Sequence, residues 1–162
     1  MLNLMYITNQ PEIAQIAEAA GVDWIFVDME FIGKDVRQKG LDTVQNHHTF
    51  EDIVRIKKSV HQAKVIVRVN PIHEARPDYP SSKDEIEATI AAGADIVMLP
   101  YFKRVEEVSK FLQYVNGKAK TCLLVETPES ALQIDKILEL VGVDMVHIGL
   151  NDLHLALGMK FM

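Results

Sequence analysis

A chain of 162 residues with 48% hydrophobic and 25% charged residues has the size and composition of one globular domain with a substantial core. Its net charge of −6 and the absence of a basic face argue against nucleic acid or an anionic membrane as a partner. No apolar run approaches the ~20 residues that span a bilayer, and the N-terminus lacks the features of a signal peptide. We therefore expect a single cytoplasmic domain over residues 1–162, in which the lone Cys122 is a small buried side chain.

Six apolar runs of strand length alternate with helix-like segments along the chain. Strands are expected at residues 2–7, 22–28, 65–70, 95–100, 121–126 and 143–148. Helices are expected at 11–20, 49–60, 82–92, 105–114 and 128–140; the first is capped by Thr8 or Asn9, the second by Thr49 and the third by Ser81 or Ser82. The strict alternation predicts a parallel sheet with right-handed crossovers.

Three segments repeat a Gly-x-Asp pattern followed by an apolar run: AGVDWIFVD from Ala20, AGADIVMLP from Ala92 and VGVDMVHIG from Val141. Repetition on alternate strands favours a β/α barrel over an open doubly wound sheet, and no Gly-x-Gly-x-x-Gly follows the first strand. A complete eight-unit barrel needs ~250 residues. The expected fold class is therefore α/β, an incomplete TIM-type (β/α)8 barrel of about six units, with the first and sixth strands as exposed edges.

Two apolar runs lead into carboxylates, Glu126 and Asp152. Strands of β/α barrels deliver ligands for divalent ions in this way, so these acids are candidate metal ligands. Alternatively, both are helix-start acids stabilised by the helix dipole. Arg68 is the one charge in a β-branched run, which indicates either a substrate contact or an ion pair with an acid such as Glu126.

The histidines leave several alternatives open. His47 and His48 end a long polar segment that begins at Met29, and they are either proton-transfer groups or a solvated pair at a helix start. His73 is either at the barrel mouth or on a surface loop. His147 is expected in the sixth strand as a hydrogen-bonded core residue.

The chain resembles the HpcH/HpaI aldolase/citrate lyase family of the phosphoenolpyruvate/pyruvate barrel superfamily. The resemblance spans nearly the whole chain, in the order that the family has, and is weakest between Phe31 and His48. It is carried by the segments GVDWIFVDME, VIVRVNP, AGADIVMLP, LLVETPESALQIDKIL and HIGLNDLHLALG. Family members are typically full barrels and often hexamers, so the resemblance implies a homo-oligomer and a chain that lacks the C-terminal elements of the family.

The resemblance implies a metal-dependent, class II aldolase that reversibly cleaves a hydroxy-2-oxo acid to pyruvate, or a related 2-oxo acid, and an aldehyde. Glu126 and Asp152 match the two protein ligands of Mg²⁺ or Mn²⁺. Arg68 matches the arginine that contacts the keto acid and its enolate, and Asp28 and Glu30 match an acidic pair after the second strand.

Further site residues follow from the same alignment of motifs. Asn151 and the backbone near Pro100 are expected to contact the substrate. The candidates for proton transfer are Asp28, Glu30 and His48. The family usually carries a catalytic histidine where this chain has Phe31, and a glutamine is frequent where it has Leu124. Alternative functions are therefore a protein that only binds metal and keto acid, and a lyase that acts on a CoA thioester.

Overall fold

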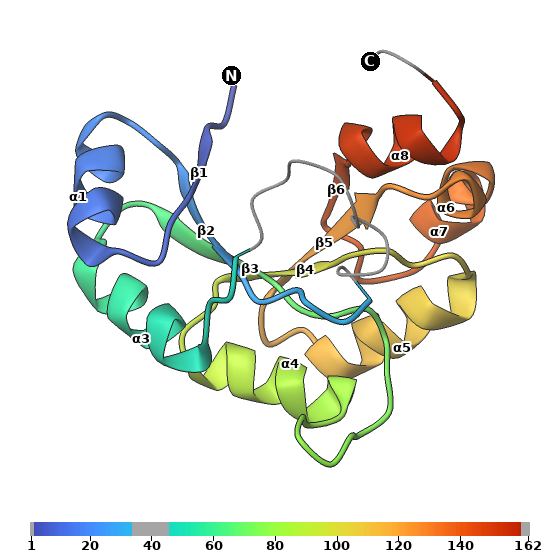
Figure 1. Ribbon diagram of the computed structural model, residues 1–162, viewed down its shortest axis with the longest axis horizontal. Coiled ribbons are helices and arrows are strands. Elements are labelled where there is room, and N and C mark those ends of the chain that lie inside the picture. Colours follow the sequence, from blue (N-terminus) through green and yellow to red (C-terminus); the bar gives the residue numbers. More distant parts are fainter. Residues whose placement is uncertain (1, 34–45, 160–162) are drawn as a thin grey trace.

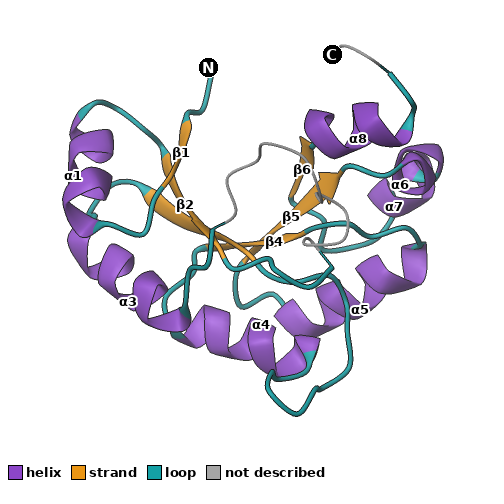
Figure 2. Ribbon diagram, in the orientation of Figure 1, coloured by secondary structure: helices purple, strands orange, loops and turns teal. Residues whose placement is uncertain are grey.

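The computed structural model describes residues 2–33 and 46–159, which form one curled sheet of six parallel strands covered by helices (Figures 1 and 2). Each strand pairs with the next one along the chain. The prediction of an incomplete barrel of the TIM type is therefore confirmed. The strands are β1 (Met5–Ile7), β2 (Trp24–Asp28), β3 (Lys64–Arg68), β4 (Ile96–Leu99), β5 (Lys120–Val125) and β6 (Met145–Ile148).

The helices lie around the outside of the curled sheet, whereas α8 lies beyond the end of β6 (Figure 2). None of the helices in the described parts of the chain is long and apolar enough to cross a membrane. The helices are α1 (Pro11–Ala19), α3 (Phe50–Ser59), α4 (Ser82–Ala91), α5 (Val105–Val115), α6 (Pro128–Leu132), α7 (Ile134–Leu138) and α8 (Leu150–Ala156).

Alternate side chains of the four inner strands, β2 to β5, belong to two different apolar clusters. One set packs against the helices on the convex face and includes Val27, Val67 and Leu123. The other set lines the concave face and includes Ile66, Met98, Cys122 and Leu124. Because both faces are apolar, the strands form nearly continuous hydrophobic runs, as is typical of parallel sheets. Cys122 is buried as predicted.

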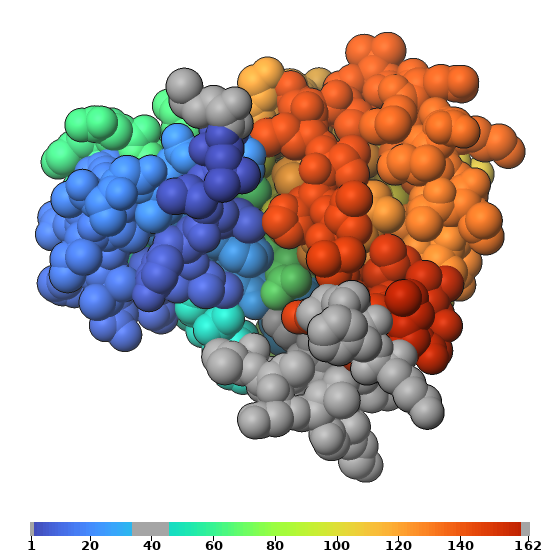
Figure 3. Space-filling model, turned by 90° about the horizontal axis from the view of Figure 1, so that it is seen from above, coloured from blue at the N-terminus to red at the C-terminus, as the bar shows by residue number. Residues whose placement is uncertain are grey.

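The two outer strands each pair on one side only within the described residues. Seen from above, the N-terminal and C-terminal parts of the chain lie on opposite sides of the concave face (Figure 3). Exposed apolar side chains follow these edges, among them Tyr6 at 48% and Ile148 at 59% exposure. The predicted exposed edges are therefore present in this structure.

The Gly-x-Asp repeat has a structural cause. Each glycine follows a helix with a positive φ (Gly21 +90°, Gly93 +111°, Gly142 +104°), a conformation that glycine adopts without strain. The aspartate two residues later accepts a hydrogen bond from the backbone N–H at the start of the preceding strand. The pairs are Asp23 with Leu4 (2.7 Å), Asp95 with Val65 (2.8 Å) and Asp144 with Thr121 (2.9 Å).

Replacing Asp95 with alanine is expected to lower the free energy of unfolding by about 1–3 kcal/mol. Asp95 also accepts two bonds from Lys57 Nζ, at 2.7 and 2.6 Å, so the substitution leaves that ammonium and the Val65 N–H without their acceptor. Urea denaturation measures the change. The matched control is Asp135→Ala at an exposed position of α7, and equal losses in both variants would contradict the role of the repeat.

Two details of the sequence prediction are wrong. The N-cap of α1 is Gln10, which makes no side-chain capping bond. The Thr8 hydroxyl accepts a hydrogen bond from the Gln10 N–H, which lies before the first residue of the helix. The single helix expected at 128–140 is divided into α6 and α7 because Gln133 leaves helical geometry (φ −109°, ψ 10°). Thr49 and Ser81 cap α3 and α4 as predicted. Residues 34–45 of the long polar segment lie outside the described residues.

Candidate active site

Arg68 is held at the carboxyl end of β3 by the acids that follow β2. Its Nε and Nη2 atoms each donate to Asp28 at 2.8 Å, and Nη1 lies 3.4 Å from Glu30 Oε2. Register places Asp28 directly opposite Arg68 in the sheet. The two carboxylates raise the pKa of Arg68 further above its usual value, although burial opposes this. Arg68 therefore carries a permanent positive charge at this rim.

The backbone around Glu30 is fixed by one buried amide, that of Asn70. Asn70 Oδ1 accepts from the N–H of Phe31 (3.0 Å) and of Ile32 (2.9 Å), whereas its Nδ2 donates to the Met29 carbonyl (3.4 Å). Nδ2 also donates to the buried Glu85 carboxylate (2.8 Å), which sets the orientation of the amide. Peptide groups on both sides of Glu30 thus bind the same side chain.

Glu126 follows β5 at the same rim and is 5% exposed. Its Oε1 accepts from the Tyr101 N–H at 2.8 Å, and Tyr101 adopts a left-handed conformation (φ 49°) that is costly for a non-glycine residue. Burial raises the pKa of Glu126 to about 7, and the neighbouring carboxylates of Glu30 and Asp152 add to this, whereas Arg68 opposes it. The Glu126 carboxyl therefore binds its proton more tightly than an ordinary glutamate does.

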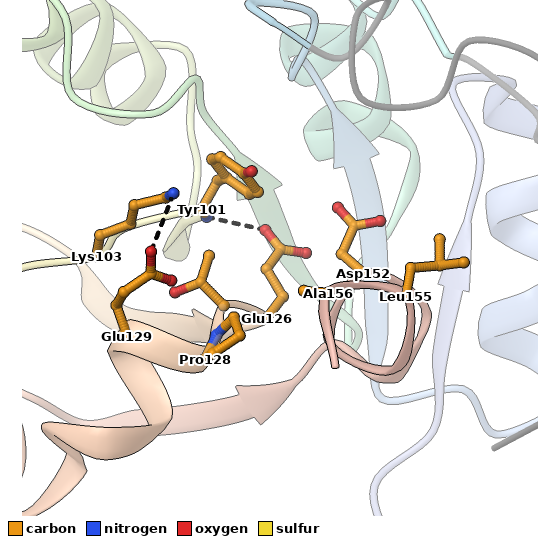
Figure 4. A pocket seen from close by; sticks show the side chains of 9 residues that line it. Tyr101, Lys103, Glu126, Pro128, Glu129, Asp152, Leu155 and Ala156 are labelled. Carbon is orange, nitrogen blue, oxygen red and sulfur yellow. Dashed lines mark hydrogen bonds and ion pairs between the residues drawn. The ribbon is translucent and has the colours of Figure 1, made fainter. Parts of the chain in front are cut away.

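Asp152 lies in the first turn of α8, which begins directly after β6. The turn between them is packed against Glu126: a Cβ added to Gly149 would lie 2.7 Å from Glu126 Cβ and 3.0 Å from Oε2. Figure 4 shows the carboxylates of Glu126 and Asp152 facing the same space. The absence of a side chain at Gly149 thus lets the two acids approach each other.

Two cavities meet at Glu126 and Asp152, which line both of them. The first, here called the arginine cavity, has a volume of about 340 Å³ and opens onto the concave face; its lining includes Phe26, Glu30, Arg68, Met98, Leu124, His147 and Asn151. The second, the lysine cavity, has a volume of about 470 Å³ and is lined also by Tyr101, Lys103, Thr127, Pro128, Glu129, Leu155 and Ala156 (Figure 4).

The donor set of Glu126 and Asp152 fits a hard divalent cation. No group of three or more His, Cys, Asp or Glu side chains within residues 2–33 and 46–159 is arranged to hold a metal ion. Two carboxylates are nevertheless a usual set for Mg²⁺, which keeps several waters or substrate oxygens as its other ligands. Burial is the main cause of the raised pKa of Glu126, and repulsion from Glu30 and Asp152 adds to it; a cation would relieve this concentration of negative charge.

The remaining predicted site residues are placed as follows. Asn151 lines the arginine cavity. Pro100 is buried, and the backbone N–H that follows it belongs to Tyr101 and binds Glu126. His48 lies elsewhere: its Nδ1 accepts from the Asp28 N–H at 2.9 Å, and it lines a separate cavity with Phe31 and Tyr79.

Two expectations for histidines are wrong. His147 lies in β6 as predicted, yet it is exposed in the arginine cavity instead of being buried, because β6 is an edge strand. The His73 side chain is 7% exposed, and its ring nitrogens lie 2.7 Å from the Pro71 carbonyl and 2.9 Å from the Pro80 carbonyl. It is therefore buried beneath its loop instead of lying on a surface or at the mouth.

Several residues that shape the site were not predicted from the sequence. Tyr101 and Lys103 follow Pro100 without any motif, and Tyr101 binds Glu126 through its backbone N–H. Asn70 and Gly149 stand inside segments that were recognised, VRVNP and HIGLND, and a polar residue or glycine directly after a strand is the available signal. Their contacts cross between strands and so require the fold.

The fold and this rim define an α/β-barrel type of protein with an acidic, arginine-containing site at the carboxyl ends of its strands. The model of the HpcH/HpaI aldolase/citrate lyase family matches residues 3–161. The chain belongs to this family, whose members are lyases.

Solved structures share the fold at low sequence identity. A citrate synthase, SbnG, superimposes with a TM-score of 0.73 and 18% identity, covering 99% of this chain and 65% of that protein. The HpcH/HpaI aldolase from Desulfitobacterium hafniense DCB-2 has a TM-score of 0.69 and 19% identity, covering 97% of this chain and 66% of the aldolase. For macrophomate synthase the values are 0.66 and 14%, with 98% and 58% covered. The chain thus spans less than two thirds of the length of these proteins, and no curated protein sequence matches it.

Proposed function

We propose that this chain carries the site of a metal-dependent carbon–carbon lyase that cleaves a hydroxy-2-oxo acid to pyruvate, or a related 2-oxo acid, and an aldehyde. The observation that carries the proposal is the convergence of Arg68, Glu30, Glu126 and Asp152 on one cavity. A keto acid offers a carboxylate and a ketone oxygen, which suit a site of one guanidinium and two candidate metal ligands. The family supports the class of reaction.

The two cavities support a reaction that joins or separates two molecules. In the proposed arrangement the keto-acid part occupies the arginine cavity, and the aldehyde part extends into the lysine cavity across Glu126 and Asp152. The backbone of Lys103 is fixed there, since its N–H donates to Glu107 (2.8 Å) and its carbonyl accepts from Gln133 (2.8 Å). A firmly held wall suits the positioning of a substrate.

The roles of the residues follow from their chemistry. Glu126 and Asp152 would hold Mg²⁺ or Mn²⁺, which when bound supplies Lewis-acid stabilisation to the keto oxygen. Arg68 adds a fixed positive charge and N–H donors for the enolate that forms as the carbon–carbon bond breaks. Asp28 and Glu30 orient the guanidinium, because both already contact it.

Pyruvate release tests the proposal. The chain is incubated with 4-hydroxy-2-oxopentanoate and Mn²⁺, and pyruvate is followed with lactate dehydrogenase and NADH. We expect release that depends on Mn²⁺ and is lost in Glu126→Ala. Release that is undetectable, or unchanged by the substitution, would reject the lyase.

A binding protein without turnover is the second candidate, favoured by Phe31. The Phe31 ring packs edge-on against Tyr79 at 4.8 Å and is turned into the separate cavity, so this position contributes no proton-transfer group to the arginine cavity. Titration calorimetry with Mg²⁺ and oxalate, an enolate analogue, separates the candidates: binding without release of pyruvate would favour this second function. The homo-oligomer implied by the resemblance stays a prediction, which light scattering checks.

Metal affinity is expected to fall as the pH falls through about 7. Burial and neighbouring carboxylates raise the pKa of Glu126 to about 7, and the cation must displace the proton, so the loss approaches tenfold per pH unit below that value. Calorimetric titration of Mn²⁺ between about pH 5.5 and pH 8 measures this loss of affinity. The range covers roughly one to two pH units on either side of the transition. An affinity independent of pH over this range would show that Glu126 is not a ligand.

Gly149→Ala is expected to weaken Mn²⁺ binding by about tenfold, the scale seen for residues that orient ligands. The new Cβ would lie 2.7 Å from Glu126 Cβ, so the carboxylate must move away from Asp152. The control is Gly117→Ala, where an added Cβ meets nothing within 4 Å but the φ of +67° is strained. That variant should lose stability while keeping its Mn²⁺ affinity; equal losses of affinity would argue against the packing role.

A further inference from the structure

One histidine reaches the arginine cavity, and all six histidines of the chain lie in its described parts. His147 lines that cavity together with Arg68, Glu30, Glu126 and Asp152. The others are engaged or placed elsewhere: His47 and His48 line the separate cavity, His73 is buried, His61 is exposed after α3, and the His154 ring bonds the Leu150 carbonyl.

The position of His147 follows from the sheet register. It pairs with Leu124 of β5, whose side chain belongs to the concave cluster. Gly149 lies two residues further along and therefore on the same face, where it contacts Glu126. His147 therefore lies two residues, roughly 6–7 Å along the strand, before the position that contacts Glu126. Because β6 is an edge strand, the ring is exposed to a ligand in the cavity.

The surroundings favour the neutral ring. The walls of the cavity partly desolvate it and lower the pKa of His147, and the positive charge of Arg68 lowers it further. A histidine with a lowered pKa is unprotonated at pH 7 and can accept a proton. Glu30 faces the same cavity but lies against Arg68, at 3.4 Å, and Asp28 is fully buried in its own pair with Arg68.

We propose that His147 is the general acid–base residue of this site; this inference rests on the proposed function. In the cleavage direction the ring accepts the proton of the C4 hydroxyl of the hydroxy-2-oxo acid. The oxygen's electron pair then forms the aldehyde carbonyl, the C3–C4 bond breaks, and its electrons form the enolate beside Arg68. The imidazolium returns the proton to C3, which gives pyruvate and restores the neutral ring, with no oxidant or further reactant.

The same group would catalyse the reverse of the last step, the removal of a methyl proton from pyruvate. Exchange of these protons in D₂O with Mg²⁺, followed by NMR, therefore tests His147 without any aldol cleavage. His147→Gln is expected to lower both pyruvate release and methyl exchange by about 10²-fold or more, with Mg²⁺ and oxalate binding within about twofold of the parent. His154→Gln, a histidine on α8 outside both cavities, is the control and should change neither rate.

Chemical rescue separates catalysis from packing. His147→Ala leaves an open place at the edge of the sheet, and added imidazole is expected to restore part of the exchange in this variant but not to stimulate the parent. A merely structural role would not respond to imidazole.

The outcomes distinguish the two proposals. If pyruvate release is absent but exchange occurs and falls in His147→Gln, the lyase function fails and the role of His147 stands. If release occurs and is within about threefold of the parent in His147→Gln, the role of His147 fails and the lyase stands. A parent chain that binds Mg²⁺ and oxalate but shows neither release nor exchange would overturn both.

Discussion

Glu126→Gln is expected to weaken Mn²⁺ binding by at least about 100-fold and to remove metal-dependent activity. The substitution keeps the shape of the side chain, and the amide oxygen can still accept from the Tyr101 N–H, which lies 2.8 Å from Oε1 in the parent. It removes one of the two anionic ligands that the proposal assigns, and a hard cation binds a neutral amide more weakly than a carboxylate. Calorimetric titration with Mn²⁺ measures the affinity.

The same substitution is expected to preserve, or slightly raise, the stability of the metal-free protein above pH 7. Because the pKa of Glu126 is raised to about 7 in the fold, the folded state holds this proton more tightly than the unfolded chain, in which the pKa is about 4.3. Stability is therefore highest below the unfolded value and falls as the pH rises to the folded one, and glutamine removes that loss. Urea denaturation at pH 8 compares the variants.

The control for both measurements is Glu129→Gln. Glu129 lines the same lysine cavity but is exposed and lies 3.3 Å from Lys103. It should change neither the affinity for Mn²⁺ nor the free energy of unfolding measurably. Equal loss of affinity in the Glu126 and Glu129 variants would place the metal elsewhere.

Arg68→Met is expected to lower the free energy of unfolding by about 3–5 kcal/mol and to remove oxalate binding. The Asp28 and Glu30 residues are 0% and 2% exposed, so without the guanidinium two buried carboxylates lose their shared counter-charge. Packing alone does not account for such a loss, since the methionine still covers the Phe26 ring, over which the guanidinium lies at 5.4 Å. Urea denaturation and calorimetry measure the two effects.

Two comparisons make this prediction specific. Arg68→Lys keeps the charge but not the two-pronged contact with Asp28, so it should retain part of the stability while binding oxalate at least about tenfold more weakly. Arg104→Met removes an arginine whose side chain is 71% exposed and should be nearly neutral. A loss below about 1 kcal/mol in Arg68→Met would mean that the buried acids find another partner or take up protons.

The sequence by itself determined the barrel topology and much of the local structure. Alternating apolar runs and helical segments predicted six parallel strands in chain order, because the period of the apolar pattern is a local property of the chain. The Thr49 and Ser81 caps are also local, whereas the aspartates of the Gly-x-Asp repeat, although visible as a pattern, bind backbone N–H groups of the preceding strand. The candidate residues Arg68, Glu126 and Asp152 were also found in sequence, since a charge within or shortly after an apolar run stands out against its neighbours.

Only the tertiary structure decided how these residues are supported and which histidine joins them. Asn70 binds the peptides around Glu30 from a different strand, and Gly149 gives space to Glu126 across the sheet. Neither contact is visible in a one-dimensional pattern. His147 was expected in the core because its strand is apolar, yet β6 has no strand beyond it within the described residues. Whether a side chain is buried depends on which other elements cover it, and that is a property of the whole fold.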